Sequence, residues 1–188
     1  MPKVFIQQSD EAYDAMFKNR GWDVVLTPTK ADLIQFTGGA DVSPDYYGRN
    51  THPTTHCNVR RDATELSLYQ YAQDTNKLCA GICRGSQFLH AMAGGELIQD
   101  CNNHAVADGH QATLSWMPNT NILVSSTHHQ MMYTEDVGEV LMWATDNLAT
   151  YKETMDDDYN VLSLPLGRDI EAMYYESINA ISFQPHPE

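Results

Sequence analysis

Residues 78–95 read Leu-Cys-Ala-Gly-Ile-Cys-Arg-Gly-Ser-Gln-Phe-Leu-His-Ala-Met-Ala-Gly-Gly, and this stretch decides the fold. The apolar run over residues 78–82 predicts a buried strand, and the apolar residues that follow at helical spacing predict a helix ending at the glycine pair 94–95. Between strand and helix, residues 81–85 have the glycine-x-nucleophile-x-glycine form of a nucleophile elbow, with cysteine in the central position.

The spacing of this motif has a physical reason. A sharp strand-to-helix turn puts its central residue, Cys83, in strained backbone geometry, and the flanking glycines let strand and helix approach without Cβ clashes. The sulfur then lies at a helix N-terminus, where free N–H groups and the helix dipole favour a thiolate. The alternative is a buried structural cysteine in an ordinary strand-to-helix turn.

Length and composition indicate one globular domain over residues 1–188, because 42% hydrophobic residues are enough for a sizeable core. No apolar run approaches ~18 residues, so we expect no membrane span. The N-terminus enters a strand-like run at residues 4–6 without a basic region, which argues against a signal peptide. The four cysteines form no C-x-x-C pair and favour a reducing, cytoplasmic location.

The formal charge of −14 limits the classes of partner that we expect the protein to bind. Nucleic acids and anionic membranes both require a basic footprint, so we expect neither as a partner. Part of the charge falls on Glu153 and residues 156–158, for which we expect a solvated loop.

The order of elements predicts an α/β protein. A strand over residues 4–7, a helix over 10–21 and strands over 23–27 and 31–36 follow one another with short joints, which is typical of a parallel sheet. Asp62 is predicted to cap the next helix, with Glu65 three residues later completing a capping box. After Gly95 we expect a loop over 102–109 and short strands, some of them antiparallel, at 96–99, 112–116, 122–125, 139–144 and 169–175.

Two polar loops follow predicted strand ends. In the first, Gly38 and Gly39 can bring backbone N–H groups against a ligand, although a plain turn is the alternative. In the second, residues 126–130 (Ser-Thr-His-His-Gln) are polar enough to line a site, and a solvated turn is the competing interpretation.

The irregular loop over residues 45–60 contains the candidate metal ligands His52, His56 and Cys57. No partner pair at a recognised zinc spacing accompanies them. We therefore expect no metal site.

The end of the chain is the second strong signal. A strand over residues 180–183 runs into Gln-Pro-His-Pro-Glu, where two prolines forbid a helix. In extended geometry His186 and Glu188 point to the same side. The carboxylate can then hold the imidazole in one tautomer while its other nitrogen faces the Cys83 thiol, which is the logic of a Cys-His-Glu triad. The alternative is a proline-rich tail with an incidental histidine.

Residues 81–87 and 184–188 resemble the class I glutamine amidotransferase superfamily. Further segments resemble its γ-glutamyl hydrolase branch, particularly the γ-glutamyl-γ-aminobutyrate hydrolases; they are residues 38–44 with 47–48, 61–65, 94–100 and 126–130. The resemblance runs from about residue 37 to residue 188 in the right order, and several motifs in register are more specific than any one of them.

The resemblance implies a flavodoxin-like three-layer sandwich with a mostly parallel central sheet and a few antiparallel extension strands. It implies hydrolysis of a γ-glutamyl amide through a γ-glutamyl thioester, with neither metal nor cofactor. Cys83 would be the nucleophile, His186 the general base and then acid, and Glu188 its orienting carboxylate.

The resemblance also implies how substrate is held. The backbone N–H of Arg84 and one from Gly38 or Gly39 would form the oxyanion hole, and the Arg84 guanidinium would attract the glutamyl α-carboxylate. The residues that would help to hold the α-amino and α-carboxylate groups are Gln87, His128 and His129.

Three features depart from the family pattern. The family usually has an aromatic residue where Pro185 stands, which we expect to alter the pocket wall. The section before Gly38 is shorter than is common in this branch. The chain also stops at Glu188, whereas relatives usually continue with a segment that packs near the triad, so we expect either further residues or a less preorganised site.

Three functions are compatible with these residues. We favour a stand-alone hydrolase of a small-molecule γ-glutamyl amide because of the segment 128–130 and the glycine-rich loop 38–44. A glutaminase subunit that passes ammonia to a partner synthetase is the second, and a non-catalytic module on the same fold is the third, against which the intact Cys83, His186 and Glu188 argue. A homodimer is compatible with each function. No sequence motif predicts the identity of the leaving amine.

Overall fold

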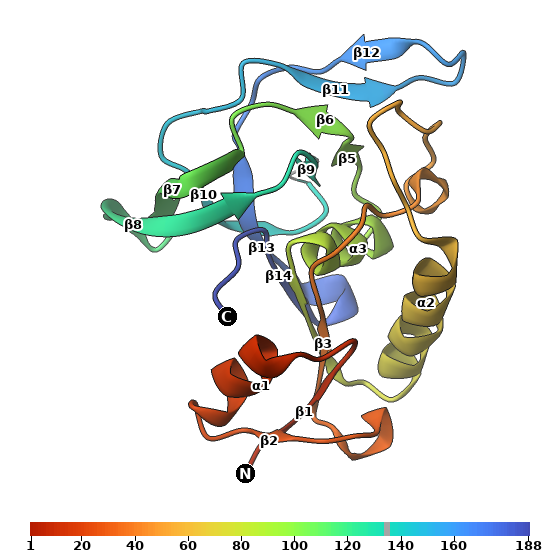
Figure 1. Ribbon diagram of the computed structural model, residues 1–188, viewed down its shortest axis with the longest axis vertical. Coiled ribbons are helices and arrows are strands. Elements are labelled where there is room, and N and C mark those ends of the chain that lie inside the picture. The colour runs from red at the N-terminus through yellow and green to blue at the C-terminus, as the bar shows by residue number, and fades with distance from the viewer. Residues whose placement is uncertain (134–135) are drawn as a thin grey trace.

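A nine-stranded mixed sheet forms the centre of the protein (Figure 1), and the computed structural model describes residues 1–133 and 136–188. The strand order is β2-β1-β3-β4-β14-β13-β10-β7-β8. The strands of this sheet are β1 Lys3–Ile6, β2 Asp23–Val24, β3 Leu33–Phe36, β4 Leu78–Ile82, β7 Ala105–Leu114, β8 Met117–Thr127, β10 Glu139–Ala144, β13 Ile170–Tyr175 and β14 Ala180–Phe183.

The sheet has a parallel half and an antiparallel half. Strands β2, β1, β3, β4 and β14 run parallel, while β13, β10, β7 and β8 pair antiparallel. The predicted α/β class with a parallel core and antiparallel extension strands is therefore confirmed. Because the carboxyl ends of β3, β4 and β14 share one edge, the segments that follow these strands meet there.

Three helices and three short 3-10 turns are found in the described residues. They are α1 Glu11–Lys18, α2 Val59–Asp74, α3 Arg84–Met92, η1 Pro28–Lys30, η2 Pro44–Tyr46 and η3 Glu176–Ile178. None of the helices described is long and apolar enough to cross a membrane.

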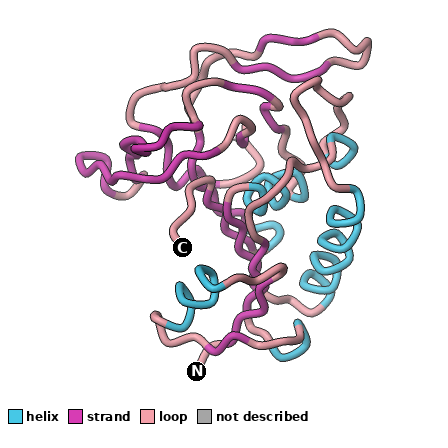
Figure 2. The backbone as a smooth tube through the Cα atoms, viewed as in Figure 1, coloured by secondary structure: helices cyan, strands magenta, loops and turns pink. Residues whose placement is uncertain are grey.

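The helices cover both faces of the parallel half. Tyr13 of α1 packs in a cluster with Leu33 on one face, whereas Ile34 and Phe36 pack with Phe88 of α3 on the other. Neighbouring residues of β3 thus point to opposite faces, as expected for a strand buried on both sides. In Figure 2 the helices α1 and α2 lie on opposite sides of the strands.

Two small sheets lie beside the antiparallel half. One has the order β12-β11-β6 and the other pairs β5 with β9. Their strands are β5 Leu97–Ile98, β6 Asp100–Cys101, β9 Met131–Met132, β11 Lys152–Met155 and β12 Val161–Ser163. Glu153 therefore belongs to a strand, and the solvated loop expected there is confined to the exposed residues 157–160 that follow Asp156.

The predicted start of α2 is wrong. The helix begins at Val59, and the side chain of Asn58 caps it by accepting a hydrogen bond from the Arg61 N–H at 3.2 Å. Asp62 and Glu65 lie inside the helix and are buried, so they form no capping box. Their carboxylates instead pair with a buried arginine of α3.

The loop predicted over residues 102–109 is also wrong in part. Strand β7 begins at Ala105 and forms a long hairpin with β8, in which Ala105 pairs with Thr127 and Ala112 with Ile122. Most of β8 is exposed, so its side chains show no alternation of apolar and polar residues. The backbone pairing, not a buried face, defines this hairpin. At the opposite edge of the sheet β2 is shorter than predicted and ends at Val24.

Candidate active site

Cys83 lies in the turn between β4 and α3 with φ 52° and ψ −111°. This left-handed φ is strained for a residue with a side chain, and the flanking glycines make it sterically accessible. A Cβ on Gly81 would collide with the Gly85 carbonyl, and a Cβ on Gly85 would collide with the carbonyl of Phe36. The chain therefore adopts the nucleophile-elbow geometry that the motif predicts.

The pairing of β14 with β4 brings His186 to Cys83. Phe183 is the register partner of Ile82, and its carbonyl accepts the Cys83 N–H at 2.8 Å. The His186 imidazole forms a hydrogen bond with the Cys83 side chain, and its Nδ1 lies 2.7 Å from Oε1 of Glu188. The two residues that are a hundred positions apart in the sequence thus share one edge of the sheet.

The electrostatics of His186 follow from these contacts. The hydrogen bond with Cys83 and then that with Glu188 raise the pKa of His186 to about 10, against the opposing effect of burial. A protonated imidazole beside the Glu188 carboxylate is thereby favoured at neutral pH. Such an imidazolium can donate a proton to a leaving group.

The C-terminal segment is also held by β8. The hydroxyl of Ser125 accepts the backbone N–H of His186 at 2.7 Å and lies 3.3 Å from the carbonyl of the same residue. No motif in the sequence marked Ser125. Its position on a strand that is far from His186 in the chain could only be found from the tertiary structure.

The glycine pair after β3 lies against His186. A Cβ on Gly38 would be 2.8 Å from Cε1 of His186 and 3.7 Å from Cβ of Cys83. The Gly38 N–H, however, donates a hydrogen bond to the hydroxyl of Tyr13 at 2.9 Å. This N–H is therefore already used, which leaves those of Gly39 and Arg84 as candidate oxyanion donors. Arg84 is the first residue of α3, where an N–H has no intrahelical acceptor.

The Arg61 side chain holds this glycine loop in place. Its guanidinium donates hydrogen bonds to the carbonyls of Gly38 and Thr37, each at 2.8 Å. Gly39 has φ +146°, and a Cβ there would collide with the Arg61 guanidinium. Arg61 also donates to Glu65 at 2.8 Å, so α2 fixes the loop that the sequence identified only as glycine-rich.

The side chain of Arg84 does not face a substrate. Its guanidinium is 1% exposed and is paired with both Asp62 and Glu65, above the ring of Phe88. The expectation that it attracts a glutamyl carboxylate is therefore wrong, because its charge is balanced within the interior. The guanidinium instead joins α3 to α2.

The other expected substrate-binding side chains have partners within the protein. Gln87 is buried and donates to the carbonyl of Gln130 at 2.9 Å. His128 is buried too, with Nδ1 2.9 Å from the same carbonyl. His129 lies between Asp41 and Asp100, and the hydrogen bond with Asp41 raises its pKa. A substrate role for these three residues stays a prediction that these contacts do not support.

An apolar cavity of about 560 Å³ adjoins His186. It lies between the β7–β8 hairpin and the C-terminal segment, and Pro185 forms part of its wall. Its lining includes Trp116, Leu123, Val124, Met142, Pro185 and His186. Pro185, which stands where the family usually has an aromatic residue, therefore lines this cavity.

The fold is that of solved glutamine amidotransferase proteins. A Thermoplasma acidophilum protein described as a GMP synthase subunit matches with a TM-score of 0.61, over 100% of this chain and 84% of that one, at 15% identity. A glutamine amidotransferase of Thermotoga maritima matches with a TM-score of 0.62, over 98% of this chain and 75% of that one, at 13% identity.

A curated relative is similar over most of its length. The glutamine amidotransferase-like protein YvdE of Lactococcus lactis is 29% identical over an alignment of 168 positions, which covers 72% of this chain and 69% of that protein. The Peptidase C26 family model matches residues 23–188. The chain therefore belongs to the Peptidase C26 family of class I glutamine amidotransferase-like proteins.

Proposed function

We propose that the protein hydrolyses γ-glutamyl amide bonds through Cys83, His186 and Glu188. The single observation that carries this proposal is the position of the His186 imidazole, between the Cys83 side chain and the Glu188 carboxylate. Membership of the Peptidase C26 family and similarity to glutamine amidotransferase-like proteins support an enzyme that cleaves amide bonds.

In the first half of the reaction, the Cys83 thiolate attacks the γ-carbonyl carbon and forms a carbon–sulfur bond. The carbonyl oxygen becomes an oxyanion, which the N–H groups of Gly39 and Arg84 stabilise. When the tetrahedral intermediate collapses, the carbon–nitrogen bond breaks and the His186 imidazolium protonates the departing amine. The product of this half is a γ-glutamyl thioester.

In the second half, the neutral His186 imidazole takes a proton from water, whose oxygen attacks the thioester carbon. The carbon–sulfur bond breaks, glutamate leaves, and the thiolate and the imidazolium are restored. Glu188 keeps the imidazole in the tautomer whose other nitrogen faces Cys83, and it stabilises the imidazolium. Each proton that His186 accepts is thus returned within one cycle.

The cavity beside His186 favours a stand-alone hydrolase. About 560 Å³ of apolar space has His186, but not Cys83, in its lining, and we infer that the leaving amine extends past the imidazole into this space. A glutaminase releases ammonia and needs no such space, whereas a hydrolase of larger γ-glutamyl amides does. Apolar walls favour a leaving amine with a hydrocarbon chain.

A glutaminase subunit that serves a partner synthetase is the second candidate. The observation in its favour is the fold shared with a protein described as one subunit of GMP synthase. This candidate predicts weak activity alone, stimulation by a partner, and a preference for glutamine. A non-catalytic module on the same fold predicts no turnover at all.

The test is a mass-spectrometric panel of γ-glutamyl amides, including glutamine and γ-glutamyl-γ-aminobutyrate, with Cys83→Ala beside the wild type. We expect release of glutamate and amine by the wild type and none by the variant. Cys57→Ala is the matched control, because it removes an exposed thiol outside the site. Full turnover by the Cys83 variant would refute the assignment, and a clear preference for glutamine would favour the glutaminase.

The finer descriptions of fold and location belong to the same proposal. A flavodoxin-like three-layer sandwich is supported by the packing of α1 on one face of the sheet and of α3 on the other. A cytoplasmic location is supported by the four cysteines, all of them free thiols.

A further inference from the structure

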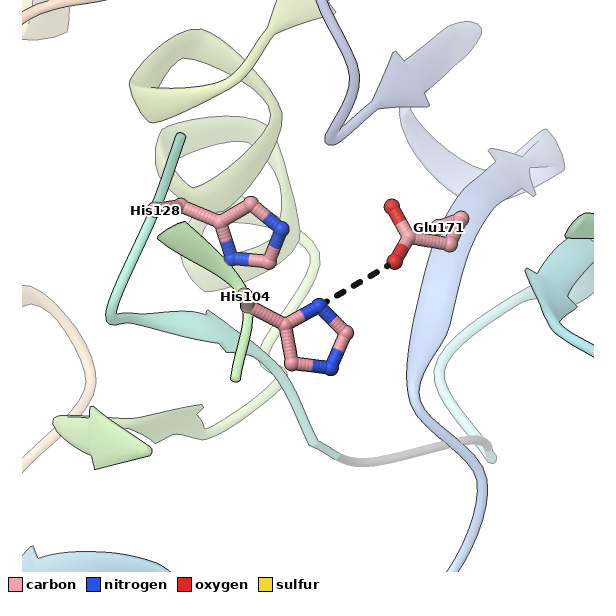
Figure 3. Close-up of side chains that lie close together, drawn as sticks. All are labelled: His104, His128 and Glu171. Atoms are coloured by element: carbon pink, nitrogen blue, oxygen red, sulfur yellow. Dashed lines mark ion pairs between the residues drawn. The ribbon is translucent and has the colours of Figure 1, made fainter. Parts of the chain in front are cut away.

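A cluster of three buried side chains lies in the antiparallel half of the molecule. His104 immediately precedes β7, His128 follows the end of β8, and Glu171 is on β13. Each offers one ligand atom, and these atoms all lie within 4.8 Å of one another. Figure 3 shows both imidazole rings turned toward the Glu171 carboxylate.

The hydrogen bonds around the two histidines fix their tautomers. Nε2 of His104 lies 3.0 Å from a carboxylate oxygen of Asp169, and Nδ1 of His128 lies 2.9 Å from the carbonyl of Gln130. Both acceptors lack a proton, so these nitrogens are the donors. In a neutral ring the other nitrogen then carries a lone pair into the cluster. A carboxylate or carbonyl that orients a histidine in this way is the usual outer partner of a metal ligand.

The atoms that face the cluster have no hydrogen-bond partner in the described part of the chain. They are His104 Nδ1, His128 Nε2 and Oε2 of Glu171, whereas Oε1 of Glu171 lies 2.9 Å from Nε2 of His110. Buried polar atoms are nearly always paired, so three without a partner at one point require an explanation. His104 and Glu171 are 0% exposed and His128 is 5% exposed, so these atoms are not in contact with bulk solvent.

The spacing of these atoms suits a metal ion better than a hydrogen bond. Nδ1 of His104 is 3.6 Å from Oε1 of Glu171, which is beyond the hydrogen-bond range. Ligands at about 2.0–2.2 Å from a tetrahedral zinc ion are themselves about 3.4 Å apart. The gap between the two side chains therefore matches one edge of such a site.

The local charge also favours a cation. Asp169 is balanced by Lys152, whose Nζ is 2.7 Å from its carboxylate. Glu171 has no such lysine or arginine among the described residues; the further group that faces it is His110, with Nε2 at 2.9 Å from Oε1. A buried carboxylate is destabilising unless it is paired or bound to a metal, and a metal ion would place a full positive charge beside Glu171.

We propose that His104, His128 and Glu171 bind a divalent transition metal, with Zn²⁺ the best fit to two imidazoles and one carboxylate. The ion ties the start of β7 and the end of β8 to β13. The Glu171 carbonyl accepts the N–H of Gln184 at 2.8 Å, so the ion steadies the strand that carries the His186 segment. This is a structural site that takes no part in the cleavage chemistry.

The test begins with wild-type protein stripped of metal by a chelator and dialysed, to which Zn²⁺ alone is added. We expect one Zn²⁺ per chain, measured by competition with a chromophoric chelator, and a rise in the midpoint of thermal unfolding. Glu171→Gln keeps the shape of the side chain and removes its charge, and we expect it to lower the affinity more than about 100-fold, beyond the loss from an outer partner. His128→Gln is a second variant with the same expected loss.

Two control variants separate this site from others. His56→Gln removes an exposed histidine outside the cluster and should bind Zn²⁺ like the wild type. Cys83→Ser removes the thiol beside His186, and it too should retain the ion. Substitution with Co²⁺ should give tetrahedral visible bands without thiolate charge transfer. Loss of binding in Cys83→Ser, thiolate charge transfer, or wild-type affinity in both Glu171→Gln and His128→Gln would overturn the proposal.

Discussion

Replacing Glu188 by glutamine tests the electrostatics of the proposed triad. The carboxylate is 2.7 Å from Nδ1 of His186 and is the second of the two contacts that raise the pKa of His186 to about 10. Glutamine retains an oxygen that can accept the same hydrogen bond but carries no charge. The pKa of His186 should therefore fall, and it should stay above its ordinary value because the contact with Cys83 remains.

The size of this fall can be worked out from the geometry. Two unit charges whose centres are about 4 Å apart interact by about 4 kcal/mol at an effective dielectric constant of about 20. The His186 side chain is 30% exposed and that of Glu188 is 10% exposed, so solvent screening leaves roughly half, about 2 kcal/mol. At about 1.4 kcal/mol per pKa unit, the imidazole of the variant should titrate about 1.5 units lower.

The assay is an NMR titration of protein labelled with ¹⁵N-histidine. The His186 signal is assigned through its loss in His186→Gln, and Glu176→Gln is the control for an exposed carboxylate elsewhere. The alkaline limb of kcat should move down with the imidazole, because the acid that protonates the amine is lost at lower pH. An unchanged His186 titration in Glu188→Gln would refute the electrostatic role of Glu188.

Four further predictions concern the same site. Gly38→Ala would bring a Cβ within 2.8 Å of the His186 ring, so kcat/KM should fall about 100-fold with folding by circular dichroism retained; wild-type turnover would contradict this. Arg84→Met removes the arginine that pairs with buried Asp62 and one of the two arginines that pair with Glu65, so it should lower the free energy of unfolding in urea by about 3–5 kcal/mol, whereas a loss below about 1 kcal/mol would contradict the pairing. Tyr13→Phe removes the acceptor of the Gly38 N–H and should cost about 1–3 kcal/mol in the same assay; an unchanged midpoint would rule this out. Because the pKa of His186 is raised, its contribution to stability should be complete below pH about 6.5 and lost as the pH rises through about 10; His186→Gln should lose that slope in pH-dependent unfolding.

Local sequence determined the nucleophile elbow. The strand over 78–82 and the helix that follows are found where the apolar spacing predicts them. Gly81 and Gly85 are required because backbone carbonyls occupy the space where their Cβ atoms would lie. Some of these constraints are contacts between residues that are close in the chain, and others exclude a side chain at one position. A short motif can therefore encode them.

Contacts between segments that are distant in the chain could not be predicted from local sequence in this way. Asp62 and Glu65 have the spacing of a capping box, and only the position of α3 shows that they neutralise Arg84 instead. The β7–β8 hairpin is defined by backbone pairing of exposed residues, which leaves no periodic signal in the side chains. Propensity and periodicity describe what a residue prefers, whereas these partners were selected by the packing of elements.

The sequence by itself therefore determined the α/β class, the elbow at Cys83 and the pairing of His186 with Glu188 two residues later. The tertiary structure alone decided that β14 lies beside β4, so that His186 meets Cys83, and that Tyr13, Arg61 and Ser125 hold the loops around them. The physical reason is that hydrogen bonds and ion pairs depend on distance in space, and residues far apart in a chain approach one another only after the sheet has formed.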